Sequence, residues 1–436
     1  DILTMAMTIE EIRSPISRIV SEVFRRGIEW KPKFVMKCSI CATEYEEAVN
    51  ECEVCKKKGQ QSELLEPDEQ QKIRPDQFLD DCNIWDQSLI EVLKVFLFDI
   101  NAIDDGFLYI VKEYFALNDE APVMSKVLEI RRLHPATIEI DLDTQERPKN
   151  AHFFCLIHRN ESVATSQESC PKCNREKVPA MYKYMYRGAP VFLLDSEVIH
   201  HSKFAPDELY GFSPILTIFE KALSLRGMDS FLYRYFFERK VPASMVMVFT
   251  DSPEELRKQS EHIAARTRGD PNYVPLIAVS SKNNRGRVEL VRLFNTLQEM
   301  EYLPVRQEIR ERIAAIWGVT PAWQGSPEAF GGLSTQTTQL TVMSRVVEDD
   351  QNIFHNKVFP TLLDSFGVTD WTLQLPQPEE KAESTRIAFA QQRVSVANTL
   401  IQMGFKVKIK AKEVGLDDLE FIVSGEAQNP QARFGG

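Results

Sequence analysis

Two stretches of helical hydrophobic periodicity frame the middle of the chain, and a strand-rich segment separates them. In the first stretch, Ser213 suits a helix N-cap and Pro214 fits the first helical position. Apolar residues then recur at helical spacing until Pro242, which predicts a rod of roughly 40 Å. The second stretch carries Glu308 and Arg312 four positions apart, as on an exposed helix that packs against copies of itself. This arrangement suits a ring around a channel better than a closed pocket.

Ahead of the first long helix, the pattern predicts helices followed by strands. An amphipathic helix lies within residues 1–30, and Ser14-Pro15 is a plausible start for it. An apolar helical pattern spans residues 78–98, and the turn at residues 104–106 then leads into a strand. The predicted strands of this part are residues 107–115, 127–130, 137–140 and 191–194.

Between and beyond the two long helices, both kinds of element are expected. A charged helix at residues 252–267 lies among strands predicted at residues 243–250, 274–280 and 287–293. A loop with three glycines at residues 324–333 precedes a third helix, roughly residues 334–356, which should end near Pro360. Residues 379–403 are predicted to form a polar helix.

Length and charge describe a folded protein of two to four domains that does not grip nucleic acid over its whole surface. The chain has 436 residues, of which 43% are hydrophobic and 27% charged. It begins at Asp1 without a basic region or cleavage site, so we expect a cut N-terminus and no export. Its net charge of −12 would repel phosphate, yet it suits a channel past which a polyanion must slide.

Seven of the eight cysteines fall into two sets of closely spaced ligand pairs. In each set the two pairs stand ten or eleven residues apart, and the eight ligands are Cys38, Cys41, Cys52, Cys55, Cys155, His158, Cys170 and Cys173. Four thiolate or imidazole ligands suit tetrahedral zinc and leave no open position for a substrate. The sequence therefore predicts two structural zinc sites, in inserts at residues 34–60 and 152–178. We expect these inserts to need bound metal in order to fold.

The sequence offers several alternatives to this interpretation. His152 precedes Cys155 by three residues and competes with His158 as the imidazole ligand. Disulfides are disfavoured by the two-residue spacing in a chain that we expect to stay in the cytoplasm. DNA readout by the first insert is disfavoured because glutamates outnumber its lysines at Lys56, Lys57 and Lys58. Cys82, the remaining cysteine, lies in an apolar stretch and should be buried.

No residue pattern indicates catalysis. His200 and His201 are neighbours in a predicted strand, so they point to opposite faces and cannot easily chelate one ion. Asp104-Asp105 fits a turn, and Ser213 fits a helix cap without a glycine elbow around it. The chain has no glycine-rich loop of the kind that binds ATP phosphates. We therefore expect no enzyme.

Three motifs, taken in order, resemble the portal protein of tailed bacteriophages and related viruses. The first runs from the strand at residues 191–194 into Tyr210-Gly211-Phe212-Ser213-Pro214-Ile215. The second comprises Ile313-Ala314-Ala315-Ile316-Trp317-Gly318-Val319-Thr320-Pro321 and Trp323-Gln324-Gly325, with Thr320 where that family commonly has proline. The third is the segment at residues 397–416, which is similar to a helix-turn-helix. The two cysteine inserts depart from the family pattern.

The resemblance implies an α+β, portal-like, multi-domain subunit with two small zinc-knuckle inserts. Its parts would be a wing at residues 1–213, stem helices at 214–241 and 297–317, a β-containing clip at 242–296, a tunnel loop and wing helix at 318–376, and a helical crown at 377–436. Such subunits form a ring, usually a dodecamer, at one capsid vertex of the virion after assembly in the host cytoplasm. The partners implied are viral double-stranded DNA, terminase, the major capsid protein and the neck or head-tail connector proteins, with no membrane.

The loop at residues 322–333 resembles the tunnel loop of that family, which projects into the channel. We therefore expect Trp323, Gln324 and Phe330 to lie near DNA, with a plain surface loop as the alternative. Two other classes of protein were considered for the whole chain. A zinc-dependent nucleic-acid-binding or processing protein would need an open metal position or a carboxylate cluster. A monomeric zinc-knuckle adaptor would leave the two long helices unexplained.

Overall fold

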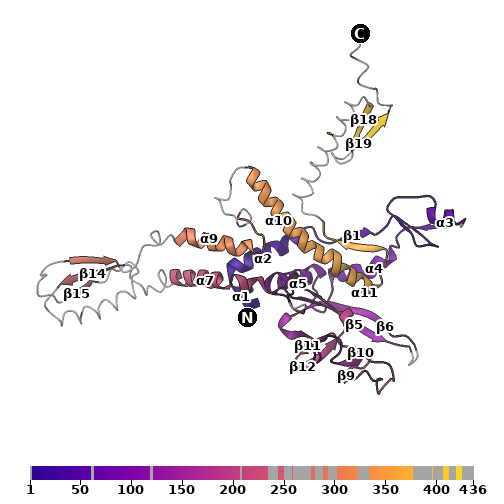
Figure 1. Cartoon of the computed structure of the whole chain (residues 1–436), viewed down its shortest axis with the longest axis horizontal. Helices are drawn as coiled ribbons and strands as arrows, with labels where there is room; N and C mark the ends of the chain where they lie inside the picture. The colour runs from indigo at the N-terminus through magenta and orange to yellow at the C-terminus, as the bar shows by residue number, and fades with distance from the viewer. Residues whose placement is uncertain are drawn as a thin grey trace, which may run out of the picture. The chain divides into compact units, whose positions relative to one another are not determined.

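The chain folds into a mixture of α-helices and β-sheets (Figure 1). The computed structural model describes residues 2–59, 63–117, 121–206, 209–233, 244–249, 258, 276–279, 288–292, 302–321, 324, 333–376, 395, 406–411 and 419–424. They divide into two compact units, each built from three stretches of sequence. The first unit comprises Asp1–Arg18, Phe98–Asp105 and His201–Gly325, and the second comprises Ile19–Leu97, Gly106–His200 and Ser326–Gly436.

Within the described part of the chain, no helix combines the length and the apolar character that crossing a bilayer requires.

Helices dominate the first unit. They are α1 (Ile2–Thr8), the first half of α2 (Glu10–Val23), α6 (Pro214–Thr217), α7 (Phe219–Tyr233) and α9 (Tyr302–Ala315). The two longest, α7 and α9, lie side by side (Figure 1). Arg306 of α9 joins them, because its guanidinium lies 3.2 Å from Asp229 of α7 and 3.1 Å from Glu11 of α2.

The first predicted long helix is confirmed at its start but is interrupted. Ser213 caps α6 by accepting a hydrogen bond from the N–H of Ile215 at 3.3 Å, and Pro214 occupies the first helical position. The helix then breaks at Ile218 and resumes as α7. Residues 234–243 lie outside the described residues, so the predicted rod is seen only as far as Tyr233. The second long helix is confirmed as α9.

The start of α6 and the end of α9 are fastened to the same turn of the chain, residues 101–105, which comprises the last three residues of α5 (Leu89–Ile103) and the two residues after it. The hydroxyl of Ser213 donates to the carbonyl oxygen of Ala102 at 2.7 Å. The indole N–H of Trp317 donates to the carbonyl oxygen of Asn101, also at 2.7 Å. Because α6–α7 leaves this turn and α9 returns to it, the two helices run in opposite directions.

Gly211 lies against the same turn and has no room for a side chain. Its N–H donates to the carboxylate of Asp105 at 3.0 Å, and a Cβ placed on it would lie 1.9 Å from the carbonyl oxygen of Asp104. Asp104 itself has a left-handed backbone, with φ of 64°. The predicted interpretation of Asp104 and Asp105 as turn residues is confirmed.

Between α7 and α9 in the sequence lies a small sheet of three strands. They are β14 (Ser244–Phe249), β15 (Leu276–Val279) and β16 (Val288–Arg292), with β14 in the centre. β15 pairs with β14 in parallel and β16 pairs with it antiparallel. These strands match the three that the sequence predicts here. The charged helix expected at residues 252–267 falls outside the described residues, apart from Lys258.

In the second unit, strands form small antiparallel sheets. The central one orders β13 (Val198–His201), β5 (Gly106–Phe115) and β6 (Met124–Leu133), and a second orders β12 (Ala189–Leu193), β11 (Tyr182–Tyr186) and β7 (Ile138–Ile140). The two inserts each add a sheet, from β2 (Met36–Cys38), β3 (Glu44–Tyr45) and β4 (Leu64–Leu65), and from β8 (Phe153–Cys155), β9 (Arg159–Ala164) and β10 (Val178–Pro179). β1 (Glu29–Pro32) pairs with the distant β17 (Trp371–Gln374).

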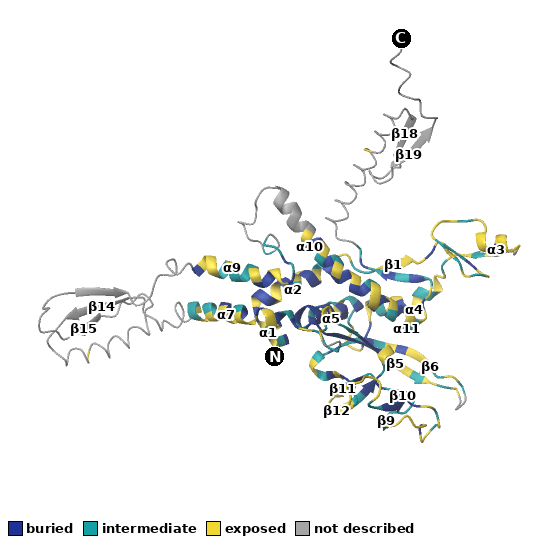
Figure 2. Cartoon of the chain, in the orientation of Figure 1, coloured by how far each residue is buried: buried dark blue, intermediate teal, exposed yellow. Residues whose placement is uncertain are grey.

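An aromatic core holds the helices of this unit together. The ring of Phe354 is fully buried and lies 5.0 Å from that of Phe24, 6.3 Å from that of Phe96 and 5.9 Å from that of Phe359. Figure 2 shows buried residues along much of α5, which carries Phe96. These rings come from three distant stretches of sequence, so hydrophobic burial assembles the unit. Phe96 belongs to α5, Phe354 to a π-turn (Phe354–Val358) and Phe359 to α11 (Phe359–Phe366). Two further helices of this unit are α4 (Gln70–Asp80) and α10 (Leu333–Ile353).

Three helix boundaries differ from the sequence expectation. The single pattern over residues 78–98 is two helices, because Cys82 donates its N–H to the carbonyl of Gln87 and closes a turn between α4 and α5. Pro15 lies inside α2, which begins at Glu10. Pro360 does not end the third helix, because it occupies the first turn of α11, where its missing N–H is tolerated.

In the predicted crown, the described residues form one antiparallel pair of strands, β18 (Lys406–Ala411) and β19 (Leu419–Ser424). The resemblance implies a helical crown here, and these two strands differ from that expectation. The polar helix expected at residues 379–403 lies outside the described residues, except for Ser395.

Candidate metal centres

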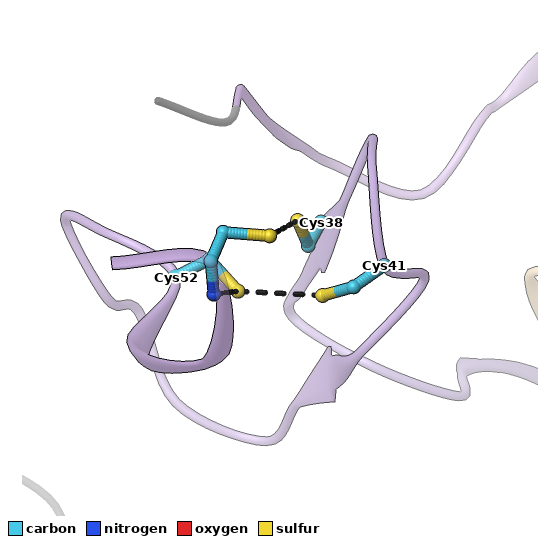
Figure 3. Close-up of side chains that lie close together, drawn as sticks. Cys38, Cys41 and Cys52 are labelled. Atoms are coloured by element: carbon cyan, nitrogen blue, oxygen red, sulfur yellow. Dashed lines mark hydrogen bonds between the residues drawn. The ribbon is translucent and has the colours of Figure 1, made fainter. Parts of the chain in front are cut away.

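The first insert brings its four cysteines together. Cys38 ends β2, and Cys52 and Cys55 flank the start of the short helix α3 (Glu53–Lys57). The sulfur of Cys38 lies 3.6 Å from that of Cys55, and the sulfur of Cys41 lies 3.5 Å from that of Cys52. Figure 3 shows the side chains of Cys38, Cys41 and Cys52 pointing toward one another. All four sulfurs lie within 4.8 Å of one another.

These spacings fit a shared ion and exclude disulfide bonds. A tetrahedral ion held by thiolates at about 2.3 Å keeps its sulfur ligands about 3.8 Å apart. Bonded disulfide sulfurs lie about 2.05 Å apart, whereas the paired sulfurs here are 3.5–3.6 Å apart. The cysteines are free thiols, and this group of four could hold a metal ion.

Tyr45 supports the first cluster from β3. Its hydroxyl donates to the sulfur of Cys52 at 3.2 Å and accepts from the N–H of Glu53 at 3.2 Å. The hydrogen bond to Cys52 raises the pKa of Tyr45 to about 12, and the same bond lowers the pKa of Cys52. Tyr45 therefore stabilises the thiolate form, which is the form that binds metal.

The second insert assembles three cysteines and one histidine. The imidazole Nδ1 of His158 lies 3.8 Å from the sulfur of Cys155 and 3.5 Å from that of Cys170. The sulfur of Cys173 lies 3.6 Å from that of Cys155. These four ligand atoms also lie within 4.8 Å of one another, so this group could hold a metal ion too.

His158 and His152, which competed for this site in the sequence, have separate surroundings. His158 faces the three thiols through Nδ1. His152 instead places its Nδ1 3.0 Å from the carboxylate of Asp141, and its ring lies 4.7 Å from that of Phe192. The geometry thus joins His158, and not His152, to Cys155.

Electrostatics favour a thiolate in the second cluster as well. Burial opposes the charged form of Cys170, yet the backbone N–H groups of Lys172 and Cys173 lower its pKa to about 6. Burial raises the pKa of Cys173. When one thiol of a cluster is already ionised near neutral pH, fewer protons must be released for a metal to bind.

Of the three residues expected near DNA, the structure describes Gln324; Trp323 and Phe330 lie outside the described residues. The side-chain oxygen of Gln324 accepts a hydrogen bond from Arg310 of α9 at 3.2 Å. Its N–H lies within reach of the carbonyl oxygen of Pro321 at 3.1 Å. Gln324 thus anchors the start of the loop to the helix that precedes it.

The other residues considered for chemistry make contacts that support the fold. His200 stacks on Phe107 of β5, with ring centroids 4.3 Å apart. The hydroxyl of Ser213 caps α6 and donates a hydrogen bond to the carbonyl oxygen of Ala102. Cys82 is buried as expected, and burial raises its pKa to about 12. None of these residues is arranged as a nucleophile with a base.

Sequence reasoning missed two residues at the metal clusters, Tyr45 and Arg159. Tyr45 lies seven residues before Cys52, a distance that carries no recognised ligand pattern. Arg159 directly follows the ligand His158, and its guanidinium pairs with Glu197 at 3.1 Å. A charged residue next to a ligand was the one available signal for Arg159.

No family model matches the sequence, and no curated protein matches it either. Solved structures match over most of its length. The neck of a native gene transfer agent particle, computed with C12 symmetry, has a TM-score of 0.49 at 12% identity, covering 90% of this chain and 88% of that one. The neck of an empty particle, computed with C6 symmetry, has a TM-score of 0.49 at 13% identity, covering 93% of both chains.

A crystal structure of an HK97 family phage portal protein from Corynebacterium diphtheriae is also similar. Its TM-score is 0.42 at 9% identity, and the match covers 86% of this chain and 95% of that one.

Proposed function

We propose that this chain is the subunit of a portal ring, which forms a channel for double-stranded DNA at one vertex of a viral capsid. The observation that carries the proposal is the pair of opposed helices α7 and α9, fastened at one end to the turn at residues 101–105. Between them the chain makes an excursion of three strands, β14, β15 and β16. Such a pair, repeated around an axis, encloses a pore.

Exposed apolar side chains on α6 and α7 give the ring its contact surface. Leu216, Phe219 and Leu223 recur at helical spacing and are 45%, 40% and 44% exposed. Side chains of this kind gain from burial against a neighbouring copy. We propose twelve copies, the number that the portal resemblance implies.

The charge of the chain suits passage of DNA. With a net charge of −12, repeated in every copy, the ring would not hold the phosphate backbone tightly. DNA could therefore slide inward during packaging and outward during ejection. The loop at residues 322–333 is our candidate for the segment next to DNA, with Trp323, Gln324 and Phe330 as its proximal residues.

The other parts of the chain would serve assembly. Residues 1–213 and 318–376 would form the wing toward the major capsid protein, and residues 377–436 the crown. The clip at residues 242–296 would dock terminase and later the neck or connector proteins. The ring would assemble in the host cytoplasm and remain in the virion.

The two clusters would each hold one zinc ion as a structural element. Cys38, Cys41, Cys52 and Cys55 supply four thiols, and Cys155, His158, Cys170 and Cys173 supply three thiols and an imidazole. Four protein ligands fill a tetrahedral shell, so neither ion would keep a position for substrate. This closure argues against the alternative of a zinc-dependent nucleic-acid-processing enzyme.

The ring is tested by particle mass. Purified full-length protein, measured by light scattering and viewed by negative-stain microscopy, should form closed annuli of many 50.1 kDa subunits. Leu216→Ser with Leu223→Ser should shift the population toward single subunits, because the proposed contact surface is lost. The matched control is Leu303→Ser on α9, which changes a leucine that is 75% exposed and outside that surface. A compact monomer under every assembly condition would exclude the proposal.

A further inference from the structure

The second metal cluster is linked through Ser162 to Arg159, whose side chain reaches a residue outside the insert. Arg159 follows His158 directly and has a left-handed backbone, with φ of 41°. The hydroxyl of Ser162 accepts from the N–H of Cys155 at 2.7 Å and donates to the carbonyl oxygen of Arg159 at 2.8 Å. The ligands Cys155 and His158 therefore belong to the same closed turn as Arg159.

The side chain of Arg159 supplies the counter-charge to a fully buried carboxylate. Its guanidinium pairs with both oxygens of Glu197, one of them at 3.1 Å, and the Glu197 side chain is 0% exposed. One oxygen of Glu197 also accepts from the N–H of Leu194 at 2.9 Å. The guanidinium lies 5.1 Å from the ring centre of Tyr114 on β5 and 5.8 Å from that of Phe154.

Glu197 occupies the single turn of 3₁₀ helix, Asp195–Glu197, that leads directly into β13. β13 and β5 are neighbours in the central sheet. Another cation, Lys112 of β5, donates to the carbonyl oxygen of Ser196 at 3.0 Å. Removing one partner of a buried ion pair is strongly destabilising because it leaves a charge without compensation. The sheet thus depends on where the insert places Arg159.

The first cluster offers a natural comparison. Its buried core consists of Cys38, Cys52 and Cys55, packed by Cys41, Tyr45 and Leu64, which come from the first insert and from β4, the strand that completes its sheet. Outside this core, Lys37 lies 4.0 Å from the carboxylate of Asp370. The second cluster instead shares a core with the neighbouring sheet, because Phe154, beside the ligand Cys155, packs in one cluster with Phe192 of β12. The two metal sites therefore differ in how they connect to the rest of their unit.

We infer that metal bound at Cys155, His158, Cys170 and Cys173 locks the sheet β13–β5–β6 by holding Arg159 against Glu197, whereas metal in the first cluster orders its own insert and leaves this sheet unchanged. The ion fixes the turn after Cys155, and the turn fixes the left-handed backbone from which Arg159 reaches the sheet. The inference rests on the proposed binding of zinc and is independent of ring formation.

The test compares two matched cysteine variants of the full chain by hydrogen exchange. Cys170→Ser breaks the second cluster and Cys52→Ser breaks the first. We expect Cys170→Ser to speed exchange of the β5 amides by about tenfold or more, which corresponds to about 1.4 kcal/mol. Cys52→Ser should leave β5 exchange unchanged while loosening residues 36–58. Zinc removal from the wild-type protein with a chelator should reproduce the β5 effect, which covers the case in which Cys170→Ser does not fold.

A third variant isolates the arginine. Arg159→Met combined with Glu197→Gln removes both charges, so zinc removal should no longer change β5 exchange in that background. The inference is overturned if zinc removal leaves β5 unchanged in the wild type, if the effect persists without the pair, or if the wild type carries no metal. Particle mass measured on the same samples reports separately on the ring.

Discussion

At the scale of single residues, the turn at residues 101–105 explains why small and specific side chains recur in the first motif. Gly211 is needed because a Cβ there would lie 1.9 Å from a backbone oxygen of Asp104. Ser213 is needed because its hydroxyl both caps α6 and donates to Ala102. Two positions of the motif, separated by Phe212, thus contact the same turn for different physical reasons: Gly211 because there is no space for a side chain, and Ser213 because of its hydrogen bonds.

Gly211→Ala should lower the free energy of unfolding by about 2–4 kcal/mol, because the backbone of Asp104 must move to admit the methyl group. Chemical denaturation of purified protein measures the change. Gly227→Ala is the matched control: Gly227 lies in α7, and a Cβ there meets nothing within 4 Å. Helix propensity alone should then stabilise the protein by up to about 1 kcal/mol. Equal effects of the two variants would contradict the proposed crowding at Gly211.

At the scale of elements, ligands that are close in the sequence were predictable and interruptions of helices were not. Each metal cluster uses two pairs of ligands with fixed short spacing, so its assembly depends on local chain geometry. The break at Ile218 was missed because apolar periodicity continues across it. The turn after Cys82 was missed because the distant strand β6 supports it: Ile130 donates its N–H to the carbonyl oxygen of Cys82 at 2.8 Å.

Residues that act on the clusters from outside them were equally hidden. The contact between Arg159 and Glu197 spans 38 positions, and nothing in either local sequence signals it. Pro360 was predicted to end a helix, but proline is also tolerated in the first turn of one. Here a π-turn precedes it, and Pro360 lies in the first turn of the next helix, α11. Local chemistry was therefore accessible from the sequence, whereas contacts made by tertiary packing were not.

Metal analysis tests the two inserts as elements. The wild-type protein should carry about two zinc ions per chain, one for each cluster. Cys38→Ser should lower that number to about one, because three thiols hold zinc much less tightly than four. The circular dichroism of the helices should remain, because the first cluster has a core of its own. Full zinc content in Cys38→Ser, or loss of all helical signal, would contradict this assignment.

At the scale of the whole molecule, the proposed channel separates assembly from contact with DNA. The proposed contact surface lies on α6 and α7. The loop at residues 322–333 is instead joined to α9, through the hydrogen bond between Arg310 and Gln324. A loop held at its base can change in its middle without disturbing the helix that carries it. Assembly and DNA retention should therefore respond to different mutations.

Deleting residues 325–332 should leave the annuli and their mass intact while reducing the DNA packaged or retained per particle. The reason is that the deletion removes the proposed DNA-proximal segment and spares Arg310, Gln324 and the contact surface of α7. Nuclease-protected DNA per purified particle is the measurement. A shortening of equal length within residues 425–432 is the matched control and should leave protected DNA unchanged. Normal DNA content in the loop deletion would remove the tunnel role from residues 322–333.

The turn at residues 101–105 accepts both of its helix contacts through main-chain oxygens, those of Asn101 and Ala102. Every amino acid carries such an oxygen, so the side chains of these two positions play no part in the bonds. The hydroxyl of Ser213 and the indole of Trp317 have no such substitute. Over long divergence these two bonds therefore constrain the donating side of the joint, whereas the side chain at Asn101 is constrained by a separate contact, a hydrogen bond that it accepts from Lys203 at 2.9 Å.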